Sequence, residues 1–73
     1  MTIIAPSDRH GEPLALGREV TVATTMMGRR CYRAGVVTAI FAGYDGAAPM
    51  IRVMFSRYDE AIVGGEECEV MTT

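Results

Sequence analysis

Aromatic and acidic side chains beside the predicted turns are the residues of this chain whose types could support binding. Tyr32 opens one β-type run, Phe55 ends another, and Tyr58, Asp59 and Glu60 follow at the next turn. A tyrosine at a turn can lean over the core and keep its hydroxyl in water. Acidic residues next to it suit contact with a basic partner. These five residues are therefore the candidate site for a protein or peptide partner.

A compact group of arginines gives a second candidate site. Arg29, Arg30 and Arg33 surround Tyr32, and every basic residue of the chain is an arginine. Guanidinium groups beside an aromatic ring suit phosphate contact and base stacking, so nucleic-acid binding is an alternative. The net charge of −2 disfavours it, because the chain lacks the broad positive field of such proteins. Neutralisation by the acidic residues is the structural alternative.

Catalytic and metal-binding patterns are missing from the sequence. It holds no Ser–His–Asp or Cys–His grouping, no phosphate-cradling glycine loop and no metal-ligand spacing. We therefore expect a non-enzymatic protein without cofactor or metal. His10 lies in a polar stretch and is expected to be solvated. Cys31 and Cys68 fall on predicted strands that flank a third, so we expect free thiols in a reducing cytoplasm.

Size and composition limit the architecture. With 73 residues the chain forms one domain with a marginal core. No apolar run approaches the roughly 20 residues that span a bilayer, so we expect a soluble, cytoplasmic protein. Methionine is flexible and adapts at interfaces, and a surface rich in it predicts a homo-oligomer. These methionines are Met26, Met27, Met50, Met54 and Met71.

The pattern of apolar residues predicts an all-β fold. Residues 1–13 read as an irregular lead-in, in which residues 2–5 could add a short edge strand, and 14–73 read as the folded domain. Gly35 marks a bend inside the second strand. Short strands at close spacing argue for closure of the sheet into a barrel. The five predicted strands cover residues 18–24, 32–41, 50–55, 60–63 and 68–71.

Three motifs resemble those of SH3-like small barrels, and within them the Tudor group. Residues 16–22, LGREVTV, are similar to the "G-x-x-V-x-V" opening strand, and YRAGVVTAI from Tyr32 resembles the Tudor "W-Y-R-A-x-V-x-x-I" strand. VMFSRYDE from Val53 resembles the "V-x-F-x-D-Y-G-N" hairpin. The resemblance implies a five-stranded barrel with an aromatic cage for a cation. Its walls would be Tyr32, Phe55 and Tyr58, and Glu60 would take the place of the polar partner.

The chain departs from the Tudor pattern at two places. Thr24, Thr25 and Met26 stand where the first strand normally supplies an aromatic, and Asp59 and Glu60 replace the glycine and asparagine of the turn. Two further families give the alternatives. A barrel of the KOW type would bind nucleic acid through the arginines. A pore enzyme like the plasmid-borne type II dihydrofolate reductases would require several copies around a shared pore, although no "V-Q-I-Y" pore strand is found.

Overall fold

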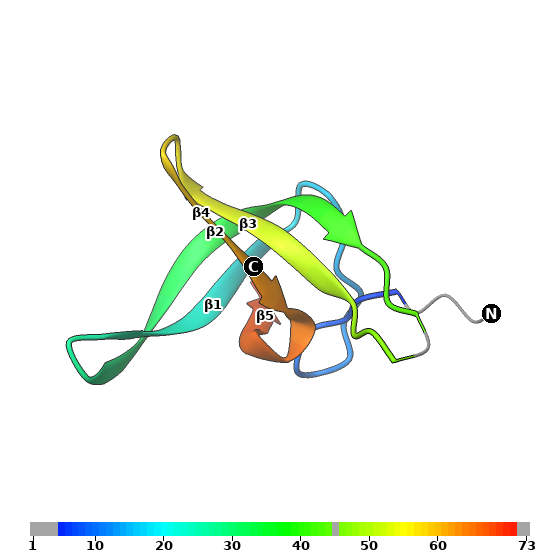
Figure 1. Ribbon diagram of the computed structural model, residues 1–73. Helices are drawn as coiled ribbons and strands as arrows, with labels where there is room; N and C mark the ends of the chain where they lie inside the picture. Colours follow the sequence, from blue (N-terminus) through cyan, green and yellow to red (C-terminus); the bar gives the residue numbers. More distant parts are fainter. Residues whose placement is uncertain (1–4, 45, 72–73) are drawn as a thin grey trace.

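Five strands form one antiparallel sheet in the computed structural model, which describes residues 5–44 and 46–71. The sheet order is β4-β3-β2-β1-β5 (Figure 1). One 3₁₀ turn, η1, precedes the last strand, and in the described residues no helix has the length and apolar character needed to cross a membrane. The all-β prediction is therefore confirmed. The elements are β1 (Glu19–Met26), β2 (Arg29–Phe41), β3 (Met50–Ser56), β4 (Asp59–Gly64), η1 (Gly65–Glu67) and β5 (Cys68–Val70).

The first hairpin follows from strand alternation and a tight turn. Val20 and Val22 of β1 are buried on what we call the inner face, the side of the sheet that carries the core. Met27 and Gly28 connect β1 to β2 with φ values of 53° and 77°. A two-residue loop with both φ values positive is a type I′ turn, whose twist matches that of the strands. Glycine fits this conformation, whereas Met27 adopts it at some cost.

Curvature of the sheet comes from β2. A Cβ atom on Gly35 would lie 2.5 Å from the Val53 side chain and 2.9 Å from the Met54 carbonyl oxygen. Only glycine therefore lets β3 cross β2 this closely. The register between β2 and β3 then shifts between Val37 and Ala39, which is the mark of a bulge. The bend was predicted at Gly35. The structure shows that β2 and β3 approach closely at Gly35 and that the bulge lies further along β2, between Val37 and Ala39.

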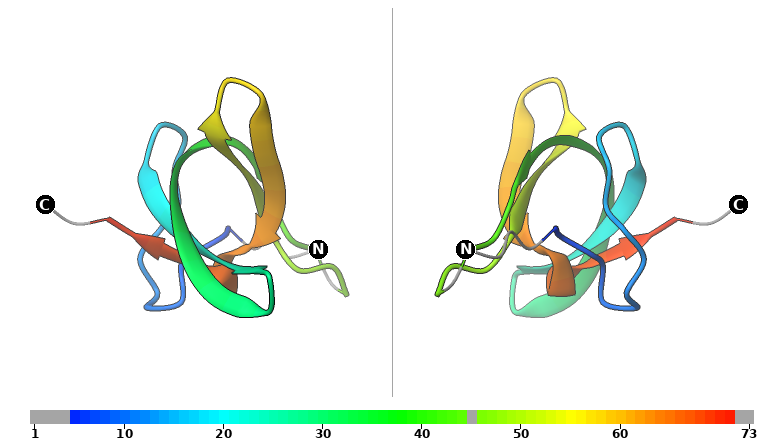
Figure 2. Two further views of the ribbon diagram at one scale, coloured as in Figure 1. Left: turned by 90° about the vertical axis from the view of Figure 1, so that its left-hand side faces the viewer. Right: turned by 90° about the vertical axis from the view of Figure 1, so that its right-hand side faces the viewer.

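The predicted closure into a barrel is wrong, because the sheet stays open. Among residues 5–44 and 46–71, β4 pairs with β3 alone and β5 with β1 alone. The physical reason is the connection between them: η1 turns the chain away from β4 and delivers a β5 of three residues to the far edge of β1. Figure 2 shows the sheet curling round, with β4 and β5 joined through η1.

The core is small and lies on the inner face. Phe55 and Val63 pack against it and are partly buried. Every central member is aliphatic apart from one cysteine, so hydrophobic burial and strand pairing together hold the fold. The buried apolar residues are Leu14, Val20, Val22, Val37, Ile51, Val53, Cys68 and Val70.

The described part of the N-terminal segment packs against the end of the chain. Ser7 and Pro13 form an isolated β-bridge, and the Arg9 N–H donates to the Cys68 carbonyl oxygen at 3.1 Å. A Cβ atom on Gly65 would collide with the Ser7 carbonyl oxygen. Residues 5–13 are thus a loop seated on η1 and β5. Residues 2–4 of the predicted edge strand lie outside the described residues.

Candidate functional site

A groove lies along the opening between β1 and β4. It encloses about 440 Å³ and has η1 at one end. Consecutive residues of β1 and of β4 line it along the edges of these two strands, together with Arg33 and Phe55 of the inner face. The lining residues are Val22–Thr25 of β1, Arg33 of β2, Phe55 of β3, Asp59 and 61–63 of β4, and Glu67 of η1.

An arginine, an aromatic ring and a carboxylate meet in this groove. The guanidinium carbon of Arg33 lies 4.3 Å from the centroid of the Phe55 ring, and its Nη2 forms an ion pair with Asp59 Oδ2. Arg33 is opposite Val22 in the β1–β2 register, which places it on the inner face. Both charged side chains are more than a third exposed, so the contact is open to water and to competing groups.

Tyr32 lies on the opposite face from this cluster. Successive side chains of a strand point to opposite faces, so Tyr32 leaves the sheet away from its neighbour Arg33. Arg9 lies over its ring, with the guanidinium carbon 5.7 Å from the ring centroid, and Tyr32 remains exposed. The structure therefore does not bring Tyr32 together with Phe55 as two walls of one cage. The place over the Phe55 ring is occupied by the chain's own Arg33.

The remaining residues predicted to bind a partner, Tyr58 and Glu60, also lie apart from the groove. Tyr58 stands in the turn between β3 and β4, and 91% of it is exposed. Glu60 is paired with Met54 in the register, and its Oε2 lies 3.9 Å from the Nε of Arg52, on the outer face of the sheet. Of the five residues predicted to bind a partner, Phe55 and Asp59 line the groove.

The three arginines of the second candidate site do not all lie on one face of the sheet. Arg30 points to the face opposite Arg33 because the two lie three positions apart in one strand. It lines a second hollow of about 440 Å³ together with Ala23–Thr25, Glu66 and Glu67. Arg29 is at the hairpin tip opposite Met26. The strand thus divides the predicted positive patch between two faces.

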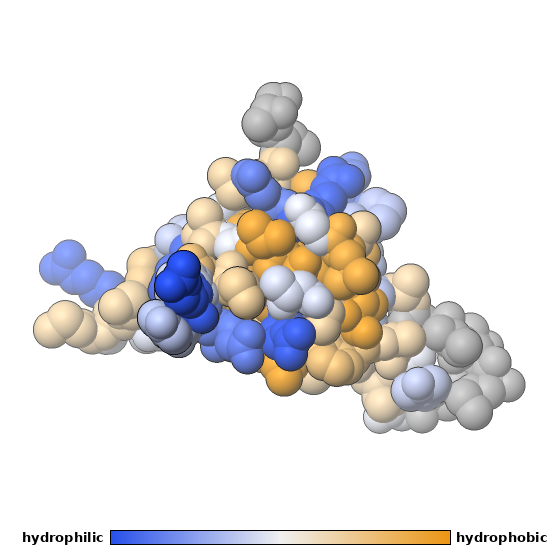
Figure 3. Space-filling model, turned by 90° about the horizontal axis from the view of Figure 1, so that it is seen from above, coloured by the Kyte–Doolittle hydropathy of each residue, from blue (hydrophilic) through white to orange (hydrophobic). Residues whose placement is uncertain are grey.

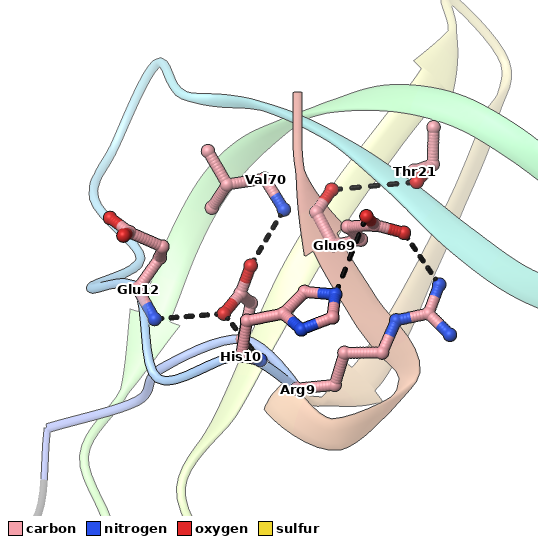
Figure 4. Close-up of polar contacts among 7 residues, drawn as sticks. Arg9, His10, Glu12, Thr21, Glu69 and Val70 are labelled. Atoms are coloured by element: carbon pink, nitrogen blue, oxygen red, sulfur yellow. Dashed lines mark hydrogen bonds and ion pairs between the residues drawn. The ribbon is translucent and has the colours of Figure 1, made fainter. Parts of the chain in front are cut away.

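Asp8 is the residue that sequence reasoning missed. It is the buried charged residue of the described segments, 6% exposed. Its Oδ1 accepts from the backbone N–H groups of His10 and Glu12, both at 2.8 Å, and its Oδ2 accepts from Val70 at 2.9 Å (Figure 4). Burial opposes ionisation, but these three donors outweigh it and hold the pKa of Asp8 below its ordinary value. An aspartate three residues before a glycine is a turn signal, yet nothing local indicates Val70.

A second set of polar contacts surrounds Glu69 on β5. Its Oε2 accepts from Arg9 Nη2 at 2.8 Å, and its Oε1 lies 3.4 Å from His10 Nε2 (Figure 4). Thr21 Oγ1 donates to the Glu69 carbonyl oxygen at 3.4 Å. His10 is exposed, as predicted, and also faces this carboxylate. These contacts tie the N-terminal loop to the outer side of the sheet.

Both cysteines are free thiols, as predicted, and their strands flank β1. Cys31 is half-buried and Cys68 is buried. Burial, together with the nearby carboxylates of Glu67 and Asp8, raises the pKa of Cys68 to about 11. Cys68 is therefore a neutral core residue near pH 7 and a poor nucleophile. Within residues 5–44 and 46–71 no three histidine, cysteine or acidic side chains gather as a metal site would require.

Comparison with known proteins leaves the family of this chain open. The structure establishes one antiparallel five-stranded sheet, whereas membership of the SH3-like or Tudor group stays a prediction. No protein-family model, curated protein or solved structure matches the chain.

Proposed function

We propose that this protein is an interaction module that holds an extended segment of a partner protein in the groove between β1 and β4. The groove itself carries the proposal: the sheet is open there, and four strands and η1 line the space. Ligand sites are concave surfaces in which a few polar groups stand among apolar ones. An SH3-like fold with the barrel left open is part of this proposal, supported by the element order and the strongly bent β2.

The chemistry of the groove favours a partner with a basic side chain. Arg33 already pairs with Asp59 and stacks on Phe55, so these two groups are suited to a guanidinium or ammonium group. Because the pair is partly exposed, an incoming cation can displace Arg33 at little energetic cost. In the free protein Arg33 thus occupies the position that the cation of the ligand would take. Tyr58 is exposed at the turn beside Asp59, and we expect it to contact the partner chain where that chain leaves the groove.

Neighbouring carboxylates on opposite faces give a matched test. A random-peptide display library is selected against the immobilised protein, and the Kd of a selected peptide is measured by isothermal titration calorimetry. Asp59→Ala removes the carboxylate in the groove and should weaken binding about tenfold or more, the loss of one charge-assisted contact. Glu60→Ala removes a carboxylate of the outer face and should change Kd by less than about twofold. Equal effects of both variants, or no peptide above background, would refute the proposal.

Self-association is a second candidate, favoured by the outer face of β2, β3 and β4. Figure 3 shows hydrophobic side chains gathered in the centre of the face seen from above. Val36 and Met54 are paired across β2 and β3, as are Phe41 and Met50, and all four are more than a third exposed. Arg52 and Glu60 lie on the same face, so two copies related by a two-fold axis could exchange this ion pair.

Light scattering tests self-association. Met54→Asp places a charge in the exposed apolar face and should shift the measured mass toward the monomer. Met27→Asp is the matched control, since Met27 stands fully exposed in the β1–β2 turn and away from that face. A monomeric wild type at high concentration would eliminate this candidate, and with it the pore-enzyme alternative, which requires a tetramer.

Nucleic-acid binding stays a prediction with less support, because Arg29 and Arg33 lie on the face opposite Arg30. Fluorescence anisotropy with single- and double-stranded DNA and RNA at low salt tests it. Binding that weakens steeply as salt rises would favour it over peptide recognition.

A further inference from the structure

The long edge of β1 that faces away from β2 is paired over only part of its length. β5 pairs with Val20, Thr21 and Val22, and its last register partner on β1 is Val22. From Ala23 to Met26 the same edge has no strand partner in residues 5–44 and 46–71. An unpaired strand edge is a template for an added strand.

The direction of the backbone groups along this edge can be assigned. The Glu19 carbonyl oxygen accepts from the Met71 N–H at 3.0 Å, so the polar backbone groups of Glu19 point toward β5. Backbone groups alternate in direction along an antiparallel strand, so Ala23 and Thr25 also present their N–H and C=O groups to this edge. Thr24, between them, points to β2, where Cys31 is its register partner. The free edge thus offers two donors and two acceptors in a regular row.

Two hollows flank this free edge, one on each face. The groove lies on the inner side, and the hollow with Arg30 lies on the outer side, and both are lined by Ala23, Thr24 and Thr25. An added strand would place alternate side chains in the two hollows. This arrangement fits an extended polypeptide better than a compact ligand.

Charge indicates what the added strand carries. In the groove Asp59 is paired with Arg33, and Glu67 lines both the groove and the outer hollow. Glu66 lines the outer hollow alone, and together Glu66 and Glu67 exceed the charge of Arg30 in that lining. A lysine or arginine of the partner, directed to the outer side, would compensate this excess of negative charge.

The other open edge, that of β4, is less suited to pairing. Within the described residues no strand is paired along this edge, so an added strand would have to start a new ladder there. The edge of β1, by contrast, continues in line with β5, so an added strand would extend an existing ladder.

We infer that the partner segment binds by β-strand addition to β1 at Ala23–Met26, in line with β5, with a basic side chain directed to Glu66. The inference rests on the proposed function and specifies its geometry: the backbone groups of Ala23 and Thr25 supply the ladder, and the two hollows select alternate side chains.

Amide hydrogen exchange of the wild-type protein tests this geometry without any risk of misfolding. In the free protein the amides of Ala23 and Thr25 should exchange fast, and that of Thr24 slowly. A peptide selected by display should slow Ala23 and Thr25 about tenfold or more at saturation and leave Thr24 nearly unchanged. Peptide binding without this alternating protection would overturn the inference.

Peptide variants and a charge variant give an independent measurement. Single N-methylation along the selected peptide should weaken binding at alternate positions, because only every second amide of an added strand faces β1. Glu66→Gln should weaken binding about threefold to tenfold, whereas Glu12→Gln on the N-terminal loop should have no effect. A uniform methylation profile together with sensitivity to Asp59→Ala would overturn strand addition and leave the proposed function intact. Absence of any groove-dependent peptide would overturn both.

Discussion

The two halves of the outer edge of β1 differ in how their backbone groups are satisfied. Along Val20–Val22 the edge is covered by β5, and β5 is itself held by Asp8 and the N-terminal loop. Along Ala23–Met26 the edge is open and borders the groove. One strand thus has a closed half and an open half. The closed half thus combines the pairing of a short strand with a buried carboxylate that accepts from Val70 of that strand.

The closed half should therefore contribute more to stability than the open half. Asp8 is buried and accepts three backbone hydrogen bonds. The Arg33–Asp59 pair of the open half is partly exposed, and exposed ion pairs contribute little. Stability and the proposed binding are then expected at opposite ends of the same strand, and four variants or conditions test this separation.

Asp8→Ala should have the largest effect. It leaves the N–H groups of His10, Glu12 and Val70 without their acceptor, and we expect a loss of about 2–4 kcal/mol in the free energy of unfolding. Urea denaturation followed by circular dichroism measures it. Asp8→Asn keeps one acceptor oxygen, so its free energy of unfolding should lie between those of the wild type and Asp8→Ala. A loss for Asp8→Ala below about 1 kcal/mol would contradict the comparison.

Gly65→Ala should come next. Its Cβ would collide with the Ser7 carbonyl oxygen, a backbone atom that cannot turn aside, so the N-terminal loop must shift. We expect a loss of about 1–3 kcal/mol, typical of overpacking. Gly64→Ala is the matched control, because there the nearest atoms are the flexible Glu66 carboxylate at 3.3 Å. Thermal unfolding of both variants measures the difference. Equal melting temperatures would contradict the packing of the N-terminal loop against η1.

The pH dependence of stability should also report on the closed half. The pKa of Asp8 is lowered in the folded state, so its contribution is present above its ordinary pKa of 3.8 and is lost as the pH falls through the lowered value. The pKa of Cys68 is raised to about 11, so stability should fall as the pH rises from 9.0 toward that value. Urea titrations across pH measure both limbs. Cys68→Ala should flatten the alkaline limb, and an unchanged limb would refute its assignment to this thiol.

Arg33→Ala should have the smallest effect on stability. The guanidinium stacks on Phe55 and pairs with Asp59 in the groove, and both charged groups are partly exposed. A double-mutant cycle of Arg33→Ala with Asp59→Ala should give a coupling below about 1 kcal/mol. The same variant should tighten binding of a basic peptide, since it vacates the Phe55 ring. A coupling above about 2 kcal/mol would mean that the open half is also a structural element.

Local patterns predicted the strands well and their assembly less well. Alternation of Val20 with Val22, and of Ile51 with Val53, indicates strands whose inner faces the structure confirms. Whether a sheet closes depends on which edges meet, and this is decided by the direction in which η1 sends the chain. The glycines and glutamates of this segment predict a turn, but they do not specify its direction. The proposed contact of Tyr32 with Phe55 fails for a similar reason. It required the correct face of β2, which only the register with β1 reveals.

Part of the candidate site could be predicted from the sequence. Phe55 and Asp59 were identified from their place beside a turn, and the structure puts both in the groove. Arg33 was assigned to a positive patch instead. Its pairing with Asp59 could not be recognised locally, because the two residues are 26 positions apart in the sequence. Asp8 was overlooked since its decisive partner, Val70, is 62 positions away. Contacts of such separation are set by the folded sheet and leave no mark on the neighbouring residues.

The bond from Asp8 to Val70 has a consequence for how the protein is made. The carboxylate near the start of the domain receives one of its donors from the final strand, so this anchor cannot form until almost the whole domain has been synthesised. The β1–β2 and β3–β4 hairpins can assemble earlier, since their partners are close in sequence. We expect a nascent chain that lacks Cys68–Val70 to remain incompletely folded on the ribosome, with the edge of β1 exposed along its entire length.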